Sequence, residues 1–157
     1  MIVLVMGVAG VGKTTIGEAL AHALDARFVD ADDYHPPENV AKMKAGIPLQ
    51  DADRWPWLQR LNQLLKDHRT AVLACSALKE AYRRRLAEGV DDFRTVYLHA
   101  TPELIRSRMQ TRHHRYMPAA LLDSQFAALE PPAGAIAVDV AAPLEESVAA
   151  ILRSLNR

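Results

Sequence analysis

The sequence lacks most of the features typical of proteins that act in membranes, on nucleic acids or in oxidising surroundings. It has one cysteine in 157 residues, which excludes an intramolecular disulfide and a cysteine-cluster metal site and fits a reducing cytosol. It has no apolar run near the ~18 residues that a membrane-spanning helix needs. Its 19 Lys and Arg balance 19 Asp and Glu, which argues against a general binder of nucleic acid or membrane surfaces. We therefore expect a cytoplasmic protein with neither kind of partner.

The composition instead suits one ordinary globular domain. Half of the residues are apolar and 24% are charged, so the chain is neither disordered nor of low complexity. A chain of 157 residues can bury one hydrophobic core but not two of full size, and we expect a single domain over residues 1–157. The apolar opening, residues 1–7, has no basic n-region and predicts a strand rather than a signal peptide.

Apolar, β-rich runs alternate with helical patterns along the whole chain. Strands are predicted at residues 2–6, 27–30, 71–75, 94–98 and 135–140. Helices are predicted at residues 13–24, from Pro37 to about 45, from Pro56 to 65, 79–87, from 101 onward, 119–129 and 144–155. This alternation predicts an α/β fold of three layers, in which a five-stranded parallel sheet carries helices on both faces.

Two long stretches contain no predicted strand, at about residues 31–70 and 112–134. We expect insertions at the carboxyl ends of strands, where ligands bind in such sheets. Charge is uneven there, because residues 106–115 hold four arginines and no acid, and residues 25–33 hold four aspartates against one arginine. This pattern is expected of a chain that handles an anion with a metal ion, although two solvated faces would also explain it.

Residues 7–14 fit the phosphate-loop pattern G-x-x-x-x-G-K-[ST] at every fixed position. Its glycines let successive backbone N–H groups point at phosphate oxygens, and the following helix adds the positive end of its dipole. Lys13 is expected to reach the β- and γ-phosphates, and the Thr14 hydroxyl to ligate Mg²⁺. The pattern predicts binding of ATP or GTP by Gly7, Val8, Ala9, Gly10, Val11, Gly12, Lys13, Thr14 and Thr15.

Two carboxylates follow the second predicted strand. Asp30 and Asp32 alternate along the chain, so both can face one site. One of these carboxylates can hold waters of the Mg²⁺ shell, and the other can accept the proton of an alcohol that attacks the γ-phosphate. Two aspartates in a polar loop are the alternative. Nearby, His35 either binds substrate or caps the turn that begins at Pro36.

Polar groups and tryptophans crowd residues 39–58 beside a predicted helix start, which suggests a small-molecule pocket. Trp57 by itself is as well explained as a core residue. The end of the third strand directs further polar side chains to the same cleft, namely Ser76, Lys79, Tyr82 and Arg83. Cys75 is most simply a buried strand residue, because the sequence implies no base to activate it.

Three blocks of the sequence resemble the gluconokinase family. Residues 30–58 fit its pattern G-D-x-x-H-P-x-x-N-x-x-K-M-x-x-G-x-P-L-x-D-x-D-R-x-P-W-L, except that Ala31 stands at the first glycine. Residues 75–83 fit C-S-A-L-K-x-x-Y-R, and residues 121–130 fit L-L-x-S-Q-F-x-x-L-E. The blocks keep their order, and the likeness runs from the phosphate loop to the last helix.

The resemblance implies the P-loop kinase fold of shikimate kinases and nucleoside monophosphate kinases, with a substrate-binding insertion at about 31–70 and a lid at about 112–118. It implies an enzyme that converts ATP and D-gluconate to ADP and 6-phospho-D-gluconate with Mg²⁺. Members are often homodimers, so we expect a homodimer. The lid should close over the reactants, because an open site would hydrolyse ATP.

The resemblance also implies roles for individual residues. The catalytic residues are Lys13, Asp32 and Arg112, and the nucleotide is bound by Arg108 and Arg112 besides the phosphate loop. The acceptor is bound by Asp32, His35, Lys42, Arg54, Lys79, Arg83 and Gln125. The metal is held by Thr14 and, through water, by Asp30. Gluconate is an anion, so Arg54, Lys79 and Arg83 are the candidates for its carboxylate.

The lid departs from the family pattern R-x-x-x-R-x-G-H-F. This chain keeps Arg108 and Arg112, but His114 stands at the glycine and Arg115 at the histidine. Which lid arginine reaches the γ-phosphate is therefore open. Residues 113–114, a pair of histidines, are not expected to bind a metal, because no carboxylate or further histidine lies at ligand spacing.

Two other functions compete with this interpretation. A P-loop kinase of the same fold can use another small acceptor, such as shikimate or a nucleoside monophosphate, and the block at residues 30–58 argues against it. A regulatory or assembly module can bind nucleotide without transferring a phosphoryl group. The presence of Asp32, Thr14 and the lid arginines argues against that alternative.

Overall fold

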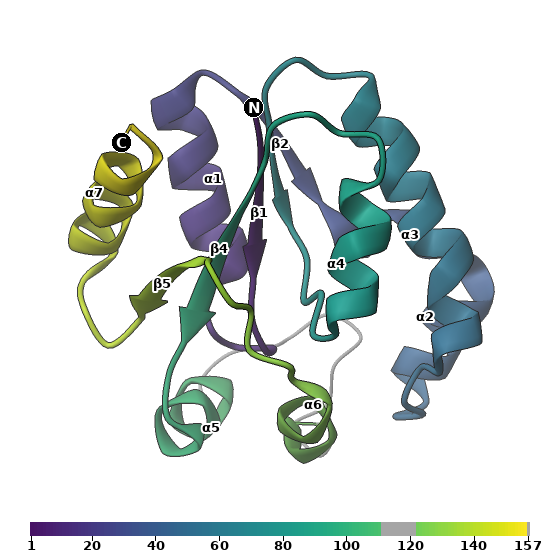
Figure 1. The fold of residues 1–157 in the computed structure, drawn as a ribbon. Coiled ribbons are helices and arrows are strands. Elements are labelled where there is room, and N and C mark those ends of the chain that lie inside the picture. The colour runs from purple at the N-terminus through teal and green to yellow at the C-terminus, as the bar shows by residue number, and fades with distance from the viewer. Residues whose placement is uncertain (111–121, 157) are drawn as a thin grey trace.

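A five-stranded parallel sheet lies at the centre of the computed structural model, which describes residues 1–110 and 122–156 (Figure 1). The strand order is β2-β3-β1-β4-β5, and every neighbouring pair is parallel. The strands are β1 (Ile2–Met6), β2 (Arg27–Asp30), β3 (Ala71–Ala74), β4 (Phe93–His99) and β5 (Ile136–Asp139). All five predicted strands are confirmed, with ends that differ by one residue at most.

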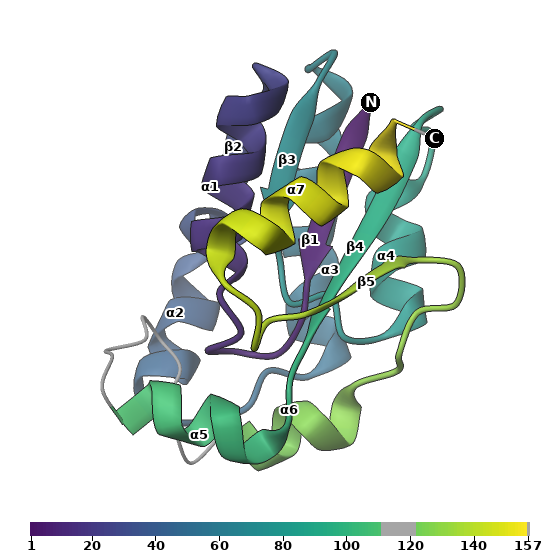
Figure 2. The same cartoon turned by 90° about the vertical axis from the view of Figure 1, so that its left-hand side faces the viewer.

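Helices cover both faces of this sheet and its carboxyl edge. They are α1 (Lys13–Leu24), α2 (Pro37–Lys44), α3 (Asp51–Lys66), α4 (Glu80–Ala87), α5 (Pro102–Gln110), α6 (Leu122–Ala128) and α7 (Leu144–Leu155), with a 3-10 turn η1 (Ala31–Tyr34). Figure 2 shows α1 and α7 on one face and α3 and α4 behind the other, while α5 and α6 lie beyond the strand ends. The predicted three-layer α/β fold is confirmed. No helix within the described ranges is both long and apolar enough to cross a membrane.

The continuous apolar run of β1 is explained by burial on both faces. Val3 and Val5 pack into the hydrophobic cluster beneath α1 and α7. Leu4 and Met6 pack into a separate cluster beneath α3 and α4. Successive strand side chains point to opposite faces, so a strand with helices on both sides has no polar face.

The start of α3 differs from the prediction. The helix begins at Asp51 rather than at Pro56, which lies inside it. Gln50 caps the helix in a reciprocal arrangement, in which the backbone N–H of Gln50 donates to Asp53 Oδ2 at 2.8 Å. This capping box supplies the start signal five residues earlier. Pro56 is exposed, and its missing N–H removes a single intrahelical hydrogen bond. The helix predicted at 119–129 is described only from Leu122 onward.

Candidate active site

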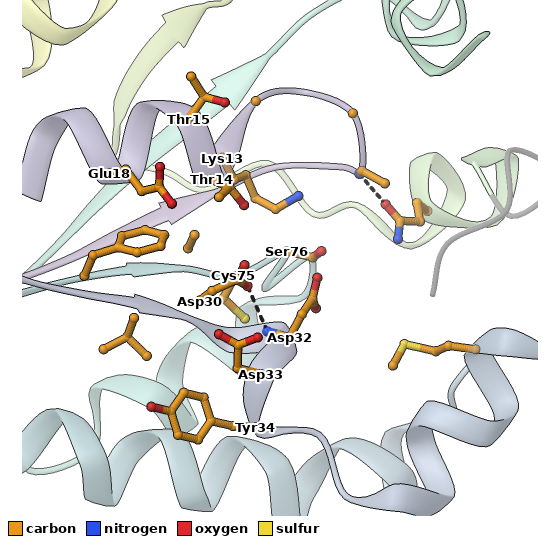
Figure 3. Close-up of a pocket in the computed structure, with 18 of the residues that line it drawn as sticks. Lys13, Thr14, Thr15, Glu18, Asp30, Asp32, Asp33, Tyr34, Cys75 and Ser76 are labelled. Atoms are coloured by element: carbon orange, nitrogen blue, oxygen red, sulfur yellow. Dashed lines mark hydrogen bonds between the residues drawn. The ribbon is translucent and has the colours of Figure 1, made fainter. Parts of the chain in front are cut away.

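A cavity of about 590 Å³ lies at the carboxyl ends of β1, β2 and β3. Figure 3 shows Lys13 and Thr14 on one side of it and Asp30 and Asp32 on the other. Ser76 borders the same space, from the segment after β3. Three separate loops thus bring together the predicted phosphate-binding, metal-binding and base residues.

The loop between β1 and α1 has the backbone of a phosphate cradle. Gly7 has φ 152°, and a Cβ atom there would lie 2.6 Å from the carbonyl oxygen of Leu98, so only glycine fits. Gly12 caps α1 with the left-handed values φ 99° and ψ 25°. The first N–H groups of α1 have no partners within the helix, and the helix dipole adds positive charge to them. The loop therefore fits the phosphates of a nucleotide.

Lys13 places a positive charge in this cavity beside the phosphate loop, and Arg27 also lines the cavity. Its Nζ donates to the carbonyl oxygen of Val8 at 3.0 Å. Burial lowers the pKa of the Lys13 ammonium, and the nearby negative charges of Asp32 and Asp30 oppose that shift. An ammonium that loses hydration without gaining a close carboxylate partner favours an incoming anion.

The donor set beside Lys13 fits Mg²⁺ bound mainly through the nucleotide. Thr14 contributes a hydroxyl and Asp30 a carboxylate to the cavity. Within the described residues, no group of three or more His, Cys, Asp or Glu side chains can hold a metal ion. Mg²⁺ commonly takes one or two protein oxygens and fills its octahedral shell with phosphate oxygens and water.

Asp30 and Asp32 line the same cavity, but they are not two residues on one face of a continuous strand as predicted. Strand β2 ends at Asp30, and Asp32 lies in the 3-10 turn η1. Asp30 Oδ1 accepts a hydrogen bond from the backbone N–H of Asp32 at 3.0 Å, which caps the turn. The carboxyl group of Asp32 is half exposed. The turn therefore orients both carboxylates toward the phosphate loop.

A second cavity adjoins the first at Asp32 and Ser76, which line both. It lies between α2, α3 and the start of α4, with α6 on its far side. Its polar lining includes His35, Arg54, Tyr82 and Gln125, and Trp57 is among its apolar lining. This cavity is where an acceptor could reach both the base and the phosphate loop.

Two cations and one carboxylate form a charged cluster next to the second cavity. Arg54 lines that cavity, whereas Lys79 and Asp51 line an adjoining cavity that shares Arg54 and Tyr82 with it. Asp51 accepts hydrogen bonds from Tyr82 Oη and, at 3.2 Å, from Lys79 Nζ. Arg54 Nη1 lies 4.0 Å from Asp51 and donates to the carbonyl oxygen of Leu49 at 2.7 Å. The hydrogen bonds from Tyr82 and Lys79 lower the pKa of Asp51. The cluster keeps an excess of one positive charge, which suits an anionic acceptor.

Several predicted site residues take other positions. Arg83 is buried, and it donates to the carbonyl oxygens of Ala77 and Glu130, both at 2.8 Å. Lys42 pairs with Asp53 at 2.9 Å. Neither Arg83 nor Lys42 lines the two cavities.

The predicted arginines of the nucleotide site are only partly described. Arg108 Nη2 donates to the carbonyl oxygen of Val140 at 2.8 Å, beside the end of β5. Arg112, Arg115 and the predicted lid at 112–118 lie outside the described residues.

Gln125 makes a contact that the sequence did not reveal. Its Oε1 accepts a hydrogen bond from the backbone N–H of Ala9 at 2.6 Å, and the side chain is buried. Gln125 borders both cavities. Gln125 was predicted as an acceptor-binding residue, whereas Asn39 and Asp51 were not predicted as site residues, although both stand at fixed positions of the block at residues 30–58.

The cysteine at the floor of the first cavity is expected to be unreactive. Cys75 is buried, and burial raises its pKa to about 12, with the carboxylate of Asp32 adding to the shift. A thiol with a raised pKa stays protonated at neutral pH, and the thiolate is the nucleophile. We expect slow alkylation by iodoacetamide in the folded protein and rapid alkylation in urea, measured by mass spectrometry. Equally fast alkylation in both states would contradict this expectation.

The chain is similar in sequence and in fold to known small kinases. The sequence model of the shikimate kinase family matches residues 9–127. The thermosensitive gluconokinase of Escherichia coli is 48% identical over 82% of this chain and 71% of its own. A probable gluconokinase of Xenopus tropicalis is 41% identical over 100% and 94%. The crystal structure of a gluconokinase from Sinorhizobium meliloti is similar with a TM-score of 0.91 and 44% identity, covering 99% of this chain and 91% of that one.

Proposed function

The chain belongs to the gluconokinase family, and we propose on that premise that it transfers the γ-phosphoryl group of ATP to the 6-hydroxyl of D-gluconate. The products are ADP and 6-phospho-D-gluconate. The observation that carries the proposal is the junction of two cavities at Asp32. One is formed around a phosphate loop, and the other is lined by Arg54, whose neighbours Lys79 and Asp51 line an adjoining cavity.

The geometry supports an in-line transfer. The 6-hydroxyl oxygen bonds to the γ-phosphorus while the bond from that phosphorus to the β–γ bridging oxygen breaks. Asp32 takes the hydroxyl proton, and Lys13 stabilises charge on the β- and γ-phosphate oxygens. Thr14 and, through water, Asp30 would hold Mg²⁺, which would neutralise further phosphate charge when bound. Arg54 and Lys79 bind the gluconate carboxylate and so fix the opposite end of the acceptor.

Acceptor identity is the direct test. With ATP and Mg²⁺, D-gluconate is expected to stimulate ADP release well above the water background, whereas shikimate and AMP are not. A coupled ADP assay measures the rates, and the mass of the product identifies the phosphorylated compound. A higher rate with shikimate or AMP under matched conditions would show that the acceptor assignment is wrong although the fold stands.

Assembly and location follow from the family resemblance. We propose a homodimer that acts in the cytosol, where its single, buried cysteine stays reduced. Sedimentation of the purified protein tests the oligomeric state.

A further inference from the structure

His35 is held in a fixed orientation beside Asp32. The His35 side chain is only 3% exposed, and its Nε2 lies 3.7 Å from Asp32 Oδ1. The imidazole stacks on the Trp57 ring, with centroids 4.0 Å apart and an interplanar angle of 17°. Trp57 is itself fixed, because its Nε1 donates to the carbonyl oxygen of Ala31 at 2.8 Å.

The second ring nitrogen of His35 faces a buried amide. Asn39 Nδ2 lies 3.3 Å from His35 Nδ1 and donates to the carbonyl oxygen of Asp53 at 2.9 Å. A carbonyl oxygen only accepts hydrogen bonds, so the group that faces it must be the NH₂ of Asn39. The same NH₂ group therefore presents its other hydrogen to His35 Nδ1. A nitrogen that accepts a hydrogen bond is unprotonated, and in the neutral ring the proton then resides on the other nitrogen.

We propose that Asn39 holds His35 as the tautomer protonated on Nε2, so that His35 donates toward Asp32 and positions its carboxylate for the acceptor. The proposal rests on the proposed function, in which Asp32 takes the proton of the hydroxyl. At 3.7 Å the contact is longer than a hydrogen bond, and a rotation of the half-exposed Asp32 side chain shortens it. His35 then orients one oxygen of Asp32, and the other oxygen would accept the proton of the 6-hydroxyl. His35 and Asn39 are thus positioning residues.

Other charges around the ring leave this assignment intact. Asp53 has its carboxylate bound to Lys42 at 2.9 Å and presents its backbone oxygen to Asn39. Arg54 lines the same cavity as His35, but its Nη1 donates to Leu49 and to Tyr82. The Nε2 side of the ring faces the carboxylate of Asp32.

The tautomer is measurable without any substrate. In protein labelled with ¹⁵N-histidine, we expect the His35 Nδ1 resonance at the frequency of an unprotonated ring nitrogen and Nε2 at that of a protonated one. The spectrum of His35→Gln identifies the signals by their loss. Asn39→Asp replaces the donor with an acceptor and is expected to move the proton to Nδ1. Protonation of Nδ1 in the unaltered protein would overturn the proposal, whether or not the Asn39 variant folds.

A matched pair of substitutions tests the functional role. Glutamine can place an amide NH₂ near the position of Nε2, whereas asparagine reaches only that of Nδ1, and both lose the stacking on Trp57 equally. We expect His35→Gln to keep a kcat with gluconate about tenfold above that of His35→Asn, a difference of about 1.4 kcal/mol in the barrier, with KM for ATP alike. Equal kcat values would overturn the positioning role. Absence of gluconate turnover in the unaltered protein would instead refute the proposed function, and the tautomer would still be read from the spectrum.

Discussion

Replacing Asp32 with asparagine is expected to lower kcat with gluconate by roughly 10²–10⁴. Asparagine keeps the size of the side chain at the junction of the two cavities but cannot take the hydroxyl proton. The nucleotide contacts that we propose come from the phosphate loop on the opposite side, so KM for ATP should stay within a few-fold. Steady-state kinetics with each substrate varied in turn provides both constants.

The same measurement separates two roles of Asp32. In a loose transition state for phosphoryl transfer, a general base contributes little to the rate. Asp32 could instead act by positioning the acceptor, and this is the alternative to the role of base. In that case KM for gluconate rises while kcat changes little. Asp91→Asn removes an exposed carboxylate in the loop before β4 and is the matched control for net charge.

Replacing Lys13 with methionine is expected to lower kcat by roughly 10²–10³, by analogy with the loss of one stabilising donor at other active sites. Negative charge shifts toward the β–γ bridge during transfer, so the ammonium matters more to the transition state than to nucleotide binding. Methionine preserves the length of the buried side chain without its charge. Burial lowers the pKa of Lys13, so removal of the ammonium should not destabilise the fold, and thermal unfolding should confirm this.

A lysine far from the cavity provides the control. Lys66→Met removes an exposed ammonium at the end of α3 and should leave kcat unchanged. Near-normal turnover in a well-folded Lys13→Met protein would contradict the assigned role of the phosphate loop.

The strands could be predicted because a strand that is buried on both faces is apolar at successive positions. The run at residues 2–6 is apolar at every position, and each position is buried. The start of α3 could not be predicted in this way, because it depends on the reciprocal contacts of Gln50 and Asp53 rather than on the spacing of apolar residues. Proline is common in the first turn of a helix, so Pro56 by itself predicts a start there. The sequence alone does not show that the helix begins before this proline.

The phosphate loop and the two aspartates could be predicted because each is a short local pattern with one chemical purpose. The hydrogen-bond partners of Lys42 and Arg83 could not be predicted from the sequence. Lys42 pairs with a carboxylate 11 positions away, and Arg83 donates to a carbonyl oxygen 47 positions away. Side chains of the same type bind either a ligand or the protein, and only the fold decides which.

The hydrogen bond between Ala9 and Gln125 joins segments 116 positions apart, and Gln125 borders both cavities. If nucleotide binding displaces the loop, this hydrogen bond would transmit the displacement to a side chain that borders the proposed acceptor cavity. Thermodynamic linkage makes such an effect symmetrical, because the factor by which ATP changes the affinity for gluconate equals the factor by which gluconate changes the affinity for ATP. A coupling of this kind would make the apparent affinity for either substrate depend on the concentration of the other.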